Sequence, residues 1–283
     1  MNNNLKTVIL LGTLSGLLLL VGRAIGGSQG LMIAFIFSLL MNGYAYFFSD
    51  KIVLRMYNAR PLDQQRYAAI YQMVSELSKS MNIPMPKLWL IDNPSANAFA
   101  TGRNPINASV AFTSSILQIL DDRELRGVVA HELSHVKNRD TLISTIAVVI
   151  ATTISYLAQM LQYSAMWGGQ SQDGRQRNNP LSLLVLAIIT PFIASLLQLA
   201  ISRSREYMAD ETGAHACHDP MALASALEKL HTHVAPRGTT TEATTSSLFI
   251  VHPFRMSTIS EWFSTHPPLR KRIERLRLMA QKR

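Results

Sequence analysis

Charged residues and cysteines are both scarce in this chain. Only 16% of its 283 residues are Asp, Glu, Lys or Arg, while 48% are hydrophobic. That balance is unusually apolar for a soluble protein, so a membrane protein is the first hypothesis. The single cysteine, Cys217, excludes an intramolecular disulfide framework. The soluble parts therefore face a reducing compartment or need no covalent cross-links.

Charge is absent altogether from four long apolar stretches, which are 7–22, 31–48, 141–162 and 181–201. The first two flank the glycine-containing turn 26–30 and predict a transmembrane hairpin. The last two are each long enough to cross a hydrocarbon core of about 30 Å, and they predict a second hairpin. Two alternatives stay open: a cleaved signal peptide for the first stretch, and a helical hairpin buried against the protein for the last two.

Basic residues gather on one side of the predicted spans. The formal net charge of +9 would suit an anionic membrane surface or nucleic acid. The flanking Lys and Arg residues on this side are Lys51, Arg55, Arg60, Lys137, Arg139, Arg203 and Arg205. Because positive charge resists translocation, segments 50–140 and 202–283 are predicted to be cytoplasmic. No nucleic-acid-binding motif accompanies the charge, so no nucleic-acid partner is expected.

The residues from His131 to His135 read His-Glu-Leu-Ser-His, the His-Glu-x-x-His pattern of zinc-dependent hydrolases. On a helix, positions i and i+4 lie on one face, so both imidazoles reach one Zn²⁺ while Glu132 projects beside it. A capping box of Asp121 and Glu124 predicts where this helix starts. The pattern therefore predicts a single zinc ion with Glu132 as the general base. The plain alternative is a polar helix face that carries two histidines.

A catalytic zinc needs a third protein ligand and leaves its fourth position to water. Glu206, which follows the fourth apolar stretch, is the predicted ligand, and Asp210 one helical turn later is placed to accept a hydrogen bond from a ligand histidine. Taken alone, both carboxylates would be ordinary helix-surface charges. Two spans or none separate His135 from Glu206, so both lie on the same side of the membrane in either case. This predicts an active site at the cytoplasmic membrane surface.

Five motifs, in order along the chain, together resemble one family. They are Ser49-Asp50-Lys51, Asn97-Ala98-Phe99-Ala100-Thr101-Gly102, the His131–His135 helix, Arg205-Glu206-Tyr207-Met208-Ala209-Asp210 and Ser264-Thr265-His266-Pro267-Pro268. Nearly the whole chain is similar to the HtpX-type heat-shock membrane metalloproteases, relatives of the prenyl-protein endopeptidases. The resemblance implies a gluzincin-type zinc endopeptidase of the bacterial inner membrane. It also implies that misfolded membrane proteins are the substrates, in stress-related quality control.

The resemblance places His266 near the metal as a candidate donor to the oxyanion, with Arg270 as a possible companion. The Arg-rich segment 270–277 is otherwise interpreted as a solvated helix face. The alternative for His266 is a surface histidine in a proline-rich turn. A substrate-binding edge strand is assigned, on the resemblance more than on pattern, to Asn97, Ala98, Phe99, Ala100 and Thr101. This run lies between two short predicted strands, 88–91 and 109–113. The alternative is an ordinary turn of the sheet.

The expected architecture is mainly α with a small β-sheet: a zincin-like α+β catalytic domain attached to four transmembrane helices. A hairpin at 1–49 precedes the first part of the domain, 50–140, in which a helix is expected from about residue 62 to 81. A second hairpin, 141–201, interrupts the domain, and 202–283 completes it. The Thr-rich run 239–247 is expected to be a mobile loop beside the cleft. The oligomeric state is left open.

Two other functions fit parts of the sequence. A non-enzymatic membrane scaffold or holdase would use the zinc site as a structural clip. Glu132 argues against that role, because a structural site has no use for a general base and closes with a fourth protein ligand. A transporter would need ionisable groups within its spans, and apart from Lys6 and Arg23 at the ends of the first stretch there are none.

Overall fold

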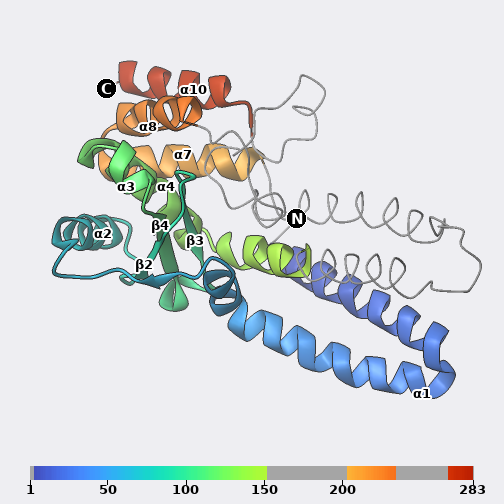
Figure 1. Cartoon of the computed structure of the whole chain (residues 1–283). Helices are drawn as coiled ribbons and strands as arrows, with labels where there is room; N and C mark the ends of the chain where they lie inside the picture. The colour runs from blue at the N-terminus through green and yellow to red at the C-terminus, as the bar shows by residue number, and fades with distance from the viewer. Residues whose placement is uncertain (1–2, 152–202, 234–266, 283) are drawn as a thin grey trace, which may run out of the picture.

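The computed structural model describes residues 3–151, 203–233 and 267–282. Three sequence predictions therefore lie outside the described residues: the fourth apolar stretch with the second half of the third, the Thr-rich run 239–247, and His266. The described elements form a small sheet covered by helices, with a long helical hairpin that projects from it (Figure 1).

The hairpin is α1, Asn3–Met56, which reverses direction so that its two halves lie side by side (Figure 1). Gly27 has a φ of +57°, a conformation that glycine adopts without strain, and it lies in the turn predicted from the sequence. Across the pair, Asn42 Nδ2 donates a hydrogen bond to Ser15 Oγ at 2.7 Å. Segment Gly27–Met56 is long and apolar enough to cross a membrane.

Four strands form one mixed sheet in the order β1-β2-β4-β3. β1 (Arg60–Pro61) pairs antiparallel with β2 (Lys87–Ile91), β2 pairs parallel with β4 (Ser109–Thr113), and β3 (Ala98–Thr101) pairs antiparallel with β4. β3 is therefore an edge strand, as predicted. The 3₁₀ turn η1 (Pro105–Asn107) lies between β3 and β4.

The sheet is apolar on both faces, and each face serves a different core. Alternate residues Ala98, Ala100, Val110 and Phe112 pack into the core around the metal helix. Their neighbours Ile91, Phe99 and Ala111 pack instead against α1 and the short apolar helix Thr141–Ala151. This strict alternation follows from the two-residue period of a strand. The sheet thus joins the site to the apolar helices.

The helix with the zinc motif, α4 (Asp122–Lys137), is the centre of the first core. It starts at the predicted capping box, in which Asp121 Oδ1 accepts from the Glu124 N–H at 2.8 Å. Around it pack α2 (Ala68–Ser80), α7 (Arg203–Cys217) and α8 (Pro220–Thr232), and α10 (Leu269–Gln281) packs on α8 and α7. The short helix α3 (Ile116–Ile119) follows β4.

One expectation about these elements changes. The helix expected from about residue 62 begins only at Ala68, because Leu62 continues the sheet by donating to Leu88 O and the Asp63 carboxylate accepts from the next turn. The expected composition, mainly helical with a small mixed sheet, is confirmed. Of four predicted spans, the described residues contain one helix that meets the length and hydropathy of a span, and the other three stay predictions.

Candidate metal centre

Three side chains from two helices meet in the buried centre of the domain. The ligand atoms of His131, His135 and Glu206 all lie within 4.8 Å of one another. The two Nε2 atoms are 3.3 Å apart. Glu206 places Oε1 at 3.5 Å from His135 Nε2 and Oε2 at 3.7 Å from His131 Nε2. The structure therefore brings together the three residues that the sequence predicted as ligands.

The ligand atoms of His131, His135 and Glu206 form a triangle, called the metal triangle below, whose dimensions suit a tetrahedrally coordinated metal ion. Ligand atoms bound to zinc at about 2.0–2.1 Å, a tetrahedral angle apart, lie about 3.3 Å from each other. Two imidazole nitrogens and one carboxylate oxygen also form a donor set that zinc prefers. The residues present thus fit the ion, with one position left for water.

Both histidines are held by carboxylates on their other ring nitrogens. His131 Nδ1 lies 3.0 Å from Asp210 Oδ1, which places Asp210 where the sequence expected a partner for a ligand histidine. His135 Nδ1 lies 3.3 Å from Asp140 Oδ2. Asp140 was not foreseen, and the one signal for it is its place at the start of the next helix, directly after the metal helix. Such contacts fix the ring orientation and leave Nε2 for a metal.

The third ligand reaches the site because α7 lies directly against α4. Glu206, Asp210 and Gly213 recur at helical spacing on the buried face of α7. A Cβ added at Gly213 would lie 2.9 Å from the backbone nitrogen of His131. The absence of a side chain at this position therefore allows the close helix contact that aligns the carboxylates with the histidines.

Glu132 lies beside the triangle and is 5% exposed. Its Oε2 accepts a hydrogen bond from the backbone N–H of Ala100 in β3 at 2.9 Å. Burial raises the pKa of the Glu132 carboxyl above its ordinary value, although the two histidines and the Ala100 N–H act against this. A carboxyl with a raised pKa takes up and releases protons more readily near neutral pH, as a general base must.

The negative charge around His135 is large when no cation is bound. Burial disfavours the charged ring, but the hydrogen bond with Asp140 and the charges of Glu206 and Glu132 outweigh it and raise the pKa of His135 to about 9. The same carboxylates favour any cation at this point. A metal ion bound here would therefore compete with a proton for His135.

Arg272 of α10 is a buried cation that the sequence analysis missed. It is 1% exposed, and its Nε and Nη2 bind the two oxygens of Asp210 at 2.9 and 2.7 Å. Its Nη1 lies 3.8 Å from Glu206 Oε2. Despite burial, Arg272 and His131 lower the pKa of Asp210 and keep it ionised. Arg272 therefore orients the carboxylate that orients His131.

The Arg-rich segment 270–277 was interpreted as a solvated helix face, and at Arg272 this was wrong. Leu269, Arg272, Ile273 and Leu276 recur at helical spacing, a pattern that places Arg272 on the buried stripe. Arg270, the predicted companion, is exposed on α10 and none of its contacts within the described residues reaches the triangle.

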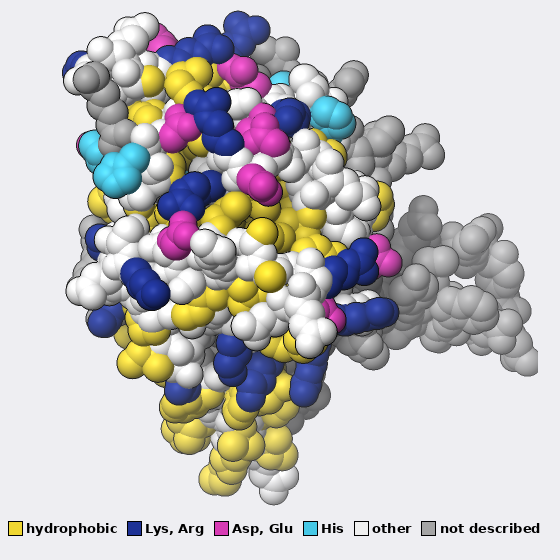
Figure 2. All heavy atoms as spheres, turned by 90° about the vertical axis from the view of Figure 1, so that its left-hand side faces the viewer, with side chains coloured by type: hydrophobic (Ala, Val, Ile, Leu, Met, Phe, Trp, Pro, Cys, Tyr) yellow, Lys and Arg dark blue, Asp and Glu magenta, His cyan; other side chains and the backbone are white. Residues whose placement is uncertain are grey.

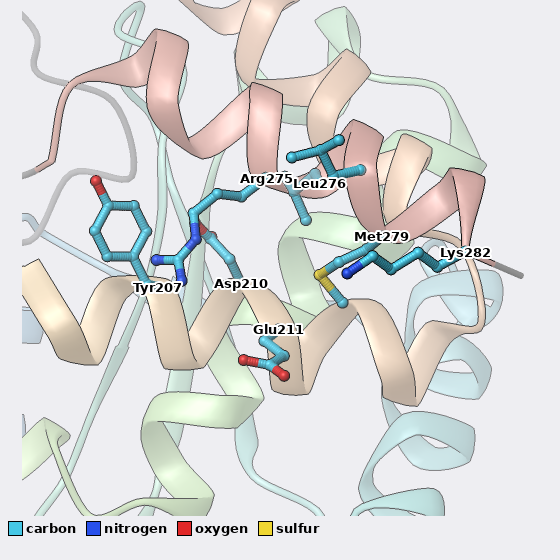
Figure 3. Close-up of a pocket in the computed structure, with 8 residues that line it drawn as sticks. Tyr207, Asp210, Glu211, Arg275, Leu276, Met279 and Lys282 are labelled. Carbon is cyan, nitrogen blue, oxygen red and sulfur yellow. The ribbon is translucent and has the colours of Figure 1, made fainter.

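A pocket of about 220 Å³ lies on the outer side of this region, between α7 and α10 (Figure 3). Asp210 contributes to its wall, and Arg275 stacks over the ring of Tyr207 at 4.2 Å. None of the three triangle residues lines this pocket, and Asp210 is the residue that the pocket shares with the site.

Comparisons with known proteins agree with this site. Residues 64–280 match the model of Peptidase family M48. The chain is 50% identical over 283 residues to a Protease HtpX homolog of Syntrophobacter fumaroxidans, which covers 99% of this chain and 100% of the relative. It is 47% identical over 284 residues to a Protease HtpX homolog of Persephonella marina, covering 99% and 98%.

Among solved structures, the crystal structure of S. mikatae Ste24p has a similar fold, with a TM-score of 0.53 at 16% sequence identity. The match covers 97% of this chain and 64% of that chain, so this chain spans about two thirds of that protein's length. The family match, the full-length relatives and the fold lead to one assignment. The chain belongs to peptidase family M48, as an HtpX-type metalloprotease.

Proposed function

We propose that this metalloprotease is a zinc-dependent endopeptidase that cleaves misfolded or damaged membrane proteins at the cytoplasmic surface of the bacterial inner membrane, in stress-related quality control. His131, His135 and Glu206 hold one Zn²⁺, and Glu132 is the general base. The observation that carries the proposal is the triangle of three ligand atoms with Glu132 directly beside it.

The chain's own residues supply proton transfer and orientation. When bound, zinc makes a water molecule more acidic and polarises the scissile carbonyl. Glu132 accepts the proton of the attacking water and later passes it to the leaving amine. Asp210 and Asp140 keep the two imidazoles in the orientation that ligation needs. His266 is kept as the candidate donor to the oxyanion.

β3 is the proposed peptide-binding strand, and its hydrogen-bonding register supports this. Thr113 N–H donates to Asn97 O, and in an antiparallel pair every second residue bonds to the partner strand. Ala98 and Ala100 therefore direct their backbone groups away from β4. Ala100 N–H already binds Glu132, so a peptide that adds to this edge lies beside the general base.

Such pairing uses main-chain groups, so it favours extended, unfolded segments over particular side chains. The sheet also packs on α1, which carries the one described candidate span, so the metal triangle lies on a domain held close to the membrane. The cytoplasmic orientation rests on the basic flanks of the predicted spans. Together these features favour loosened segments of other membrane proteins as substrates.

The test compares the detergent-solubilised wild type with Glu132→Gln for cleavage of casein, after zinc content has been measured in both. Cleavage by the wild type alone, with equal zinc, supports the proposal. Equal zinc and no cleavage by either would favour the scaffold, in which the site is a structural clip. A metal-free wild type that cleaves casein as fast as the zinc-loaded form would refute the role of the metal.

A further inference from the structure

The turn between β3 and β4, residues 102–108, carries the most exposed large apolar side chain among the described residues. Ile106 is 79% exposed. It belongs to η1, directly after Pro105. An isolated exposed isoleucine needs no explanation, so its meaning depends on what surrounds it.

This turn is closed by its own hydrogen bonds and by a close backbone contact. Asn104 Oδ1 accepts hydrogen bonds from the backbone and the side-chain nitrogens of Asn107, at 2.9 and 2.8 Å. Gly102 has a φ of +128°, and a Cβ there would lie 2.3 Å from Asn107 O. The closed turn therefore holds Ile106 outward in one position.

The same turn lies against the end of the apolar hairpin. The Arg103 guanidinium lies 5.2 Å from the centre of the Phe47 ring, within the range of a cation–π contact. Phe47 is close to the end of the uncharged run 31–48, and Asp50 and Lys51 follow it. On the other side, Thr141 Oγ1 donates to Gly102 O at 2.8 Å, which ties the turn to the start of the helix Thr141–Ala151.

The surroundings have the composition of a membrane interface. Four aromatic side chains near the end of the hairpin are exposed, namely Tyr44, Tyr46, Phe47 and Phe48. Aromatic rings collect at the boundary between hydrocarbon and head groups. Lys51 lies over the Phe48 ring at 5.1 Å, and its charge marks the water side of this boundary. Figure 2 shows Lys and Arg side chains gathered next to the apolar projection at the lower end of the molecule.

We infer that the turn 102–108 enters the bilayer surface, with Ile106 in the apolar region and Arg103 at the level of anionic lipid head groups. The partner is the lipid bilayer because the exposed apolar surface of α1 continues onto this turn. A basic residue next to an apolar one also matches the order of head group and acyl chain. β3 ends at Thr101, directly before the turn, so the proposed peptide-binding strand ends next to the segment that enters the bilayer surface.

The experiment is spin labelling of the full-length chain in liposomes that contain anionic phospholipid. Cys217 is buried and is replaced by alanine, and single cysteines for the nitroxide are then introduced by Ile106→Cys, Phe35→Cys or Gln118→Cys. Phe35 is 59% exposed on the proposed span, and Gln118 is exposed on α3 at the opposite end of the sheet. Collisions with oxygen, which concentrates in lipid, are compared with collisions with an aqueous nickel complex.

The expected result is that position 106 resembles position 35, with oxygen collisions several times more frequent, relative to nickel, than at position 118. Position 106 behaving like position 118, while position 35 reports lipid, would overturn the inference and leave the span intact. Few collisions with either reagent at position 106 would indicate a protein contact and would also overturn it. The collision rates do not depend on proteolysis. A protein that lacks the proposed protease activity would therefore still give a clear answer about the position of the turn.

Discussion

Replacing Arg272 by methionine should strongly destabilise the domain and weaken the metal site. Methionine fills a similar volume but removes the cation that binds both oxygens of Asp210 and lies 3.8 Å from Glu206. Breaking a buried ion pair on one side typically costs about 3–5 kcal/mol, because the remaining charge is buried without a partner. For a chain of this size that corresponds to a fall in Tm of roughly 6–20 °C.

The matched control is Arg270→Met, two residues earlier on the same helix, where the side chain is exposed. The thermal transition of each variant is measured in detergent with excess chelator, so that bound metal does not mask the loss. Adding Asp210→Asn to Arg272→Met should recover part of the loss, since it removes the orphaned charge. If Arg272→Met and Arg270→Met melt within about 1 °C of each other, the buried pair does not stabilise the fold and the reasoning is wrong.

Three further outcomes are expected. Glu132→Gln should lower peptide hydrolysis by about 10²–10⁴-fold or more while zinc content is unchanged, and loss of zinc would instead make Glu132 part of the metal site. Gly213→Ala should destabilise the domain by about 1–3 kcal/mol and weaken metal binding, because the added Cβ would lie 2.9 Å from His131 N. The control is Gly43→Ala, where an added Cβ has no atom within 4 Å. Equal melting temperatures of the two variants would contradict the prediction. His135 is charged below its raised pKa of about 9 and neutral above it, so metal binding at pH 7 should release about one proton. The apparent metal affinity should therefore rise about tenfold per pH unit and level off near pH 9. Titration calorimetry in buffers of different ionisation enthalpy measures both quantities, and an affinity that is flat from pH 7 to 9 would contradict the prediction.

The parts of the site that follow local rules could be predicted from the sequence. The metal helix starts at a capping box and carries its ligands at i and i+4, and both features depend on residues within one or two turns. That Glu206 lies on the same side of the membrane as the histidines followed from the number of predicted spans between them, which is two or none. The edge position of β3 was assigned on the resemblance more than on pattern, and the strand order agrees with it.

The parts that depend on contacts distant in sequence were missed or displaced. Arg272 lies among several arginines of similar appearance, and its place on the apolar stripe was the one signal that it is buried. Its pairing with Asp210 of α7 depends on a contact distant in sequence. Asp140 faces His135 because the chain turns sharply at Arg139, where φ is +57°. Helix α2 starts later than predicted because the Leu62 N–H donates a hydrogen bond to Leu88 O of β2. The spacing of apolar residues along the chain cannot reveal such a tertiary hydrogen bond.

The order of the site residues along the chain has a consequence for biosynthesis. The two histidines and Glu132 leave the ribosome first, Glu206 follows only after the apolar stretches between them have been made, and Arg272 comes after Glu206. The metal triangle is completed by α7, and the carboxylate that orients His131 is held by α10. A nascent or truncated chain therefore carries the zinc motif without a working centre.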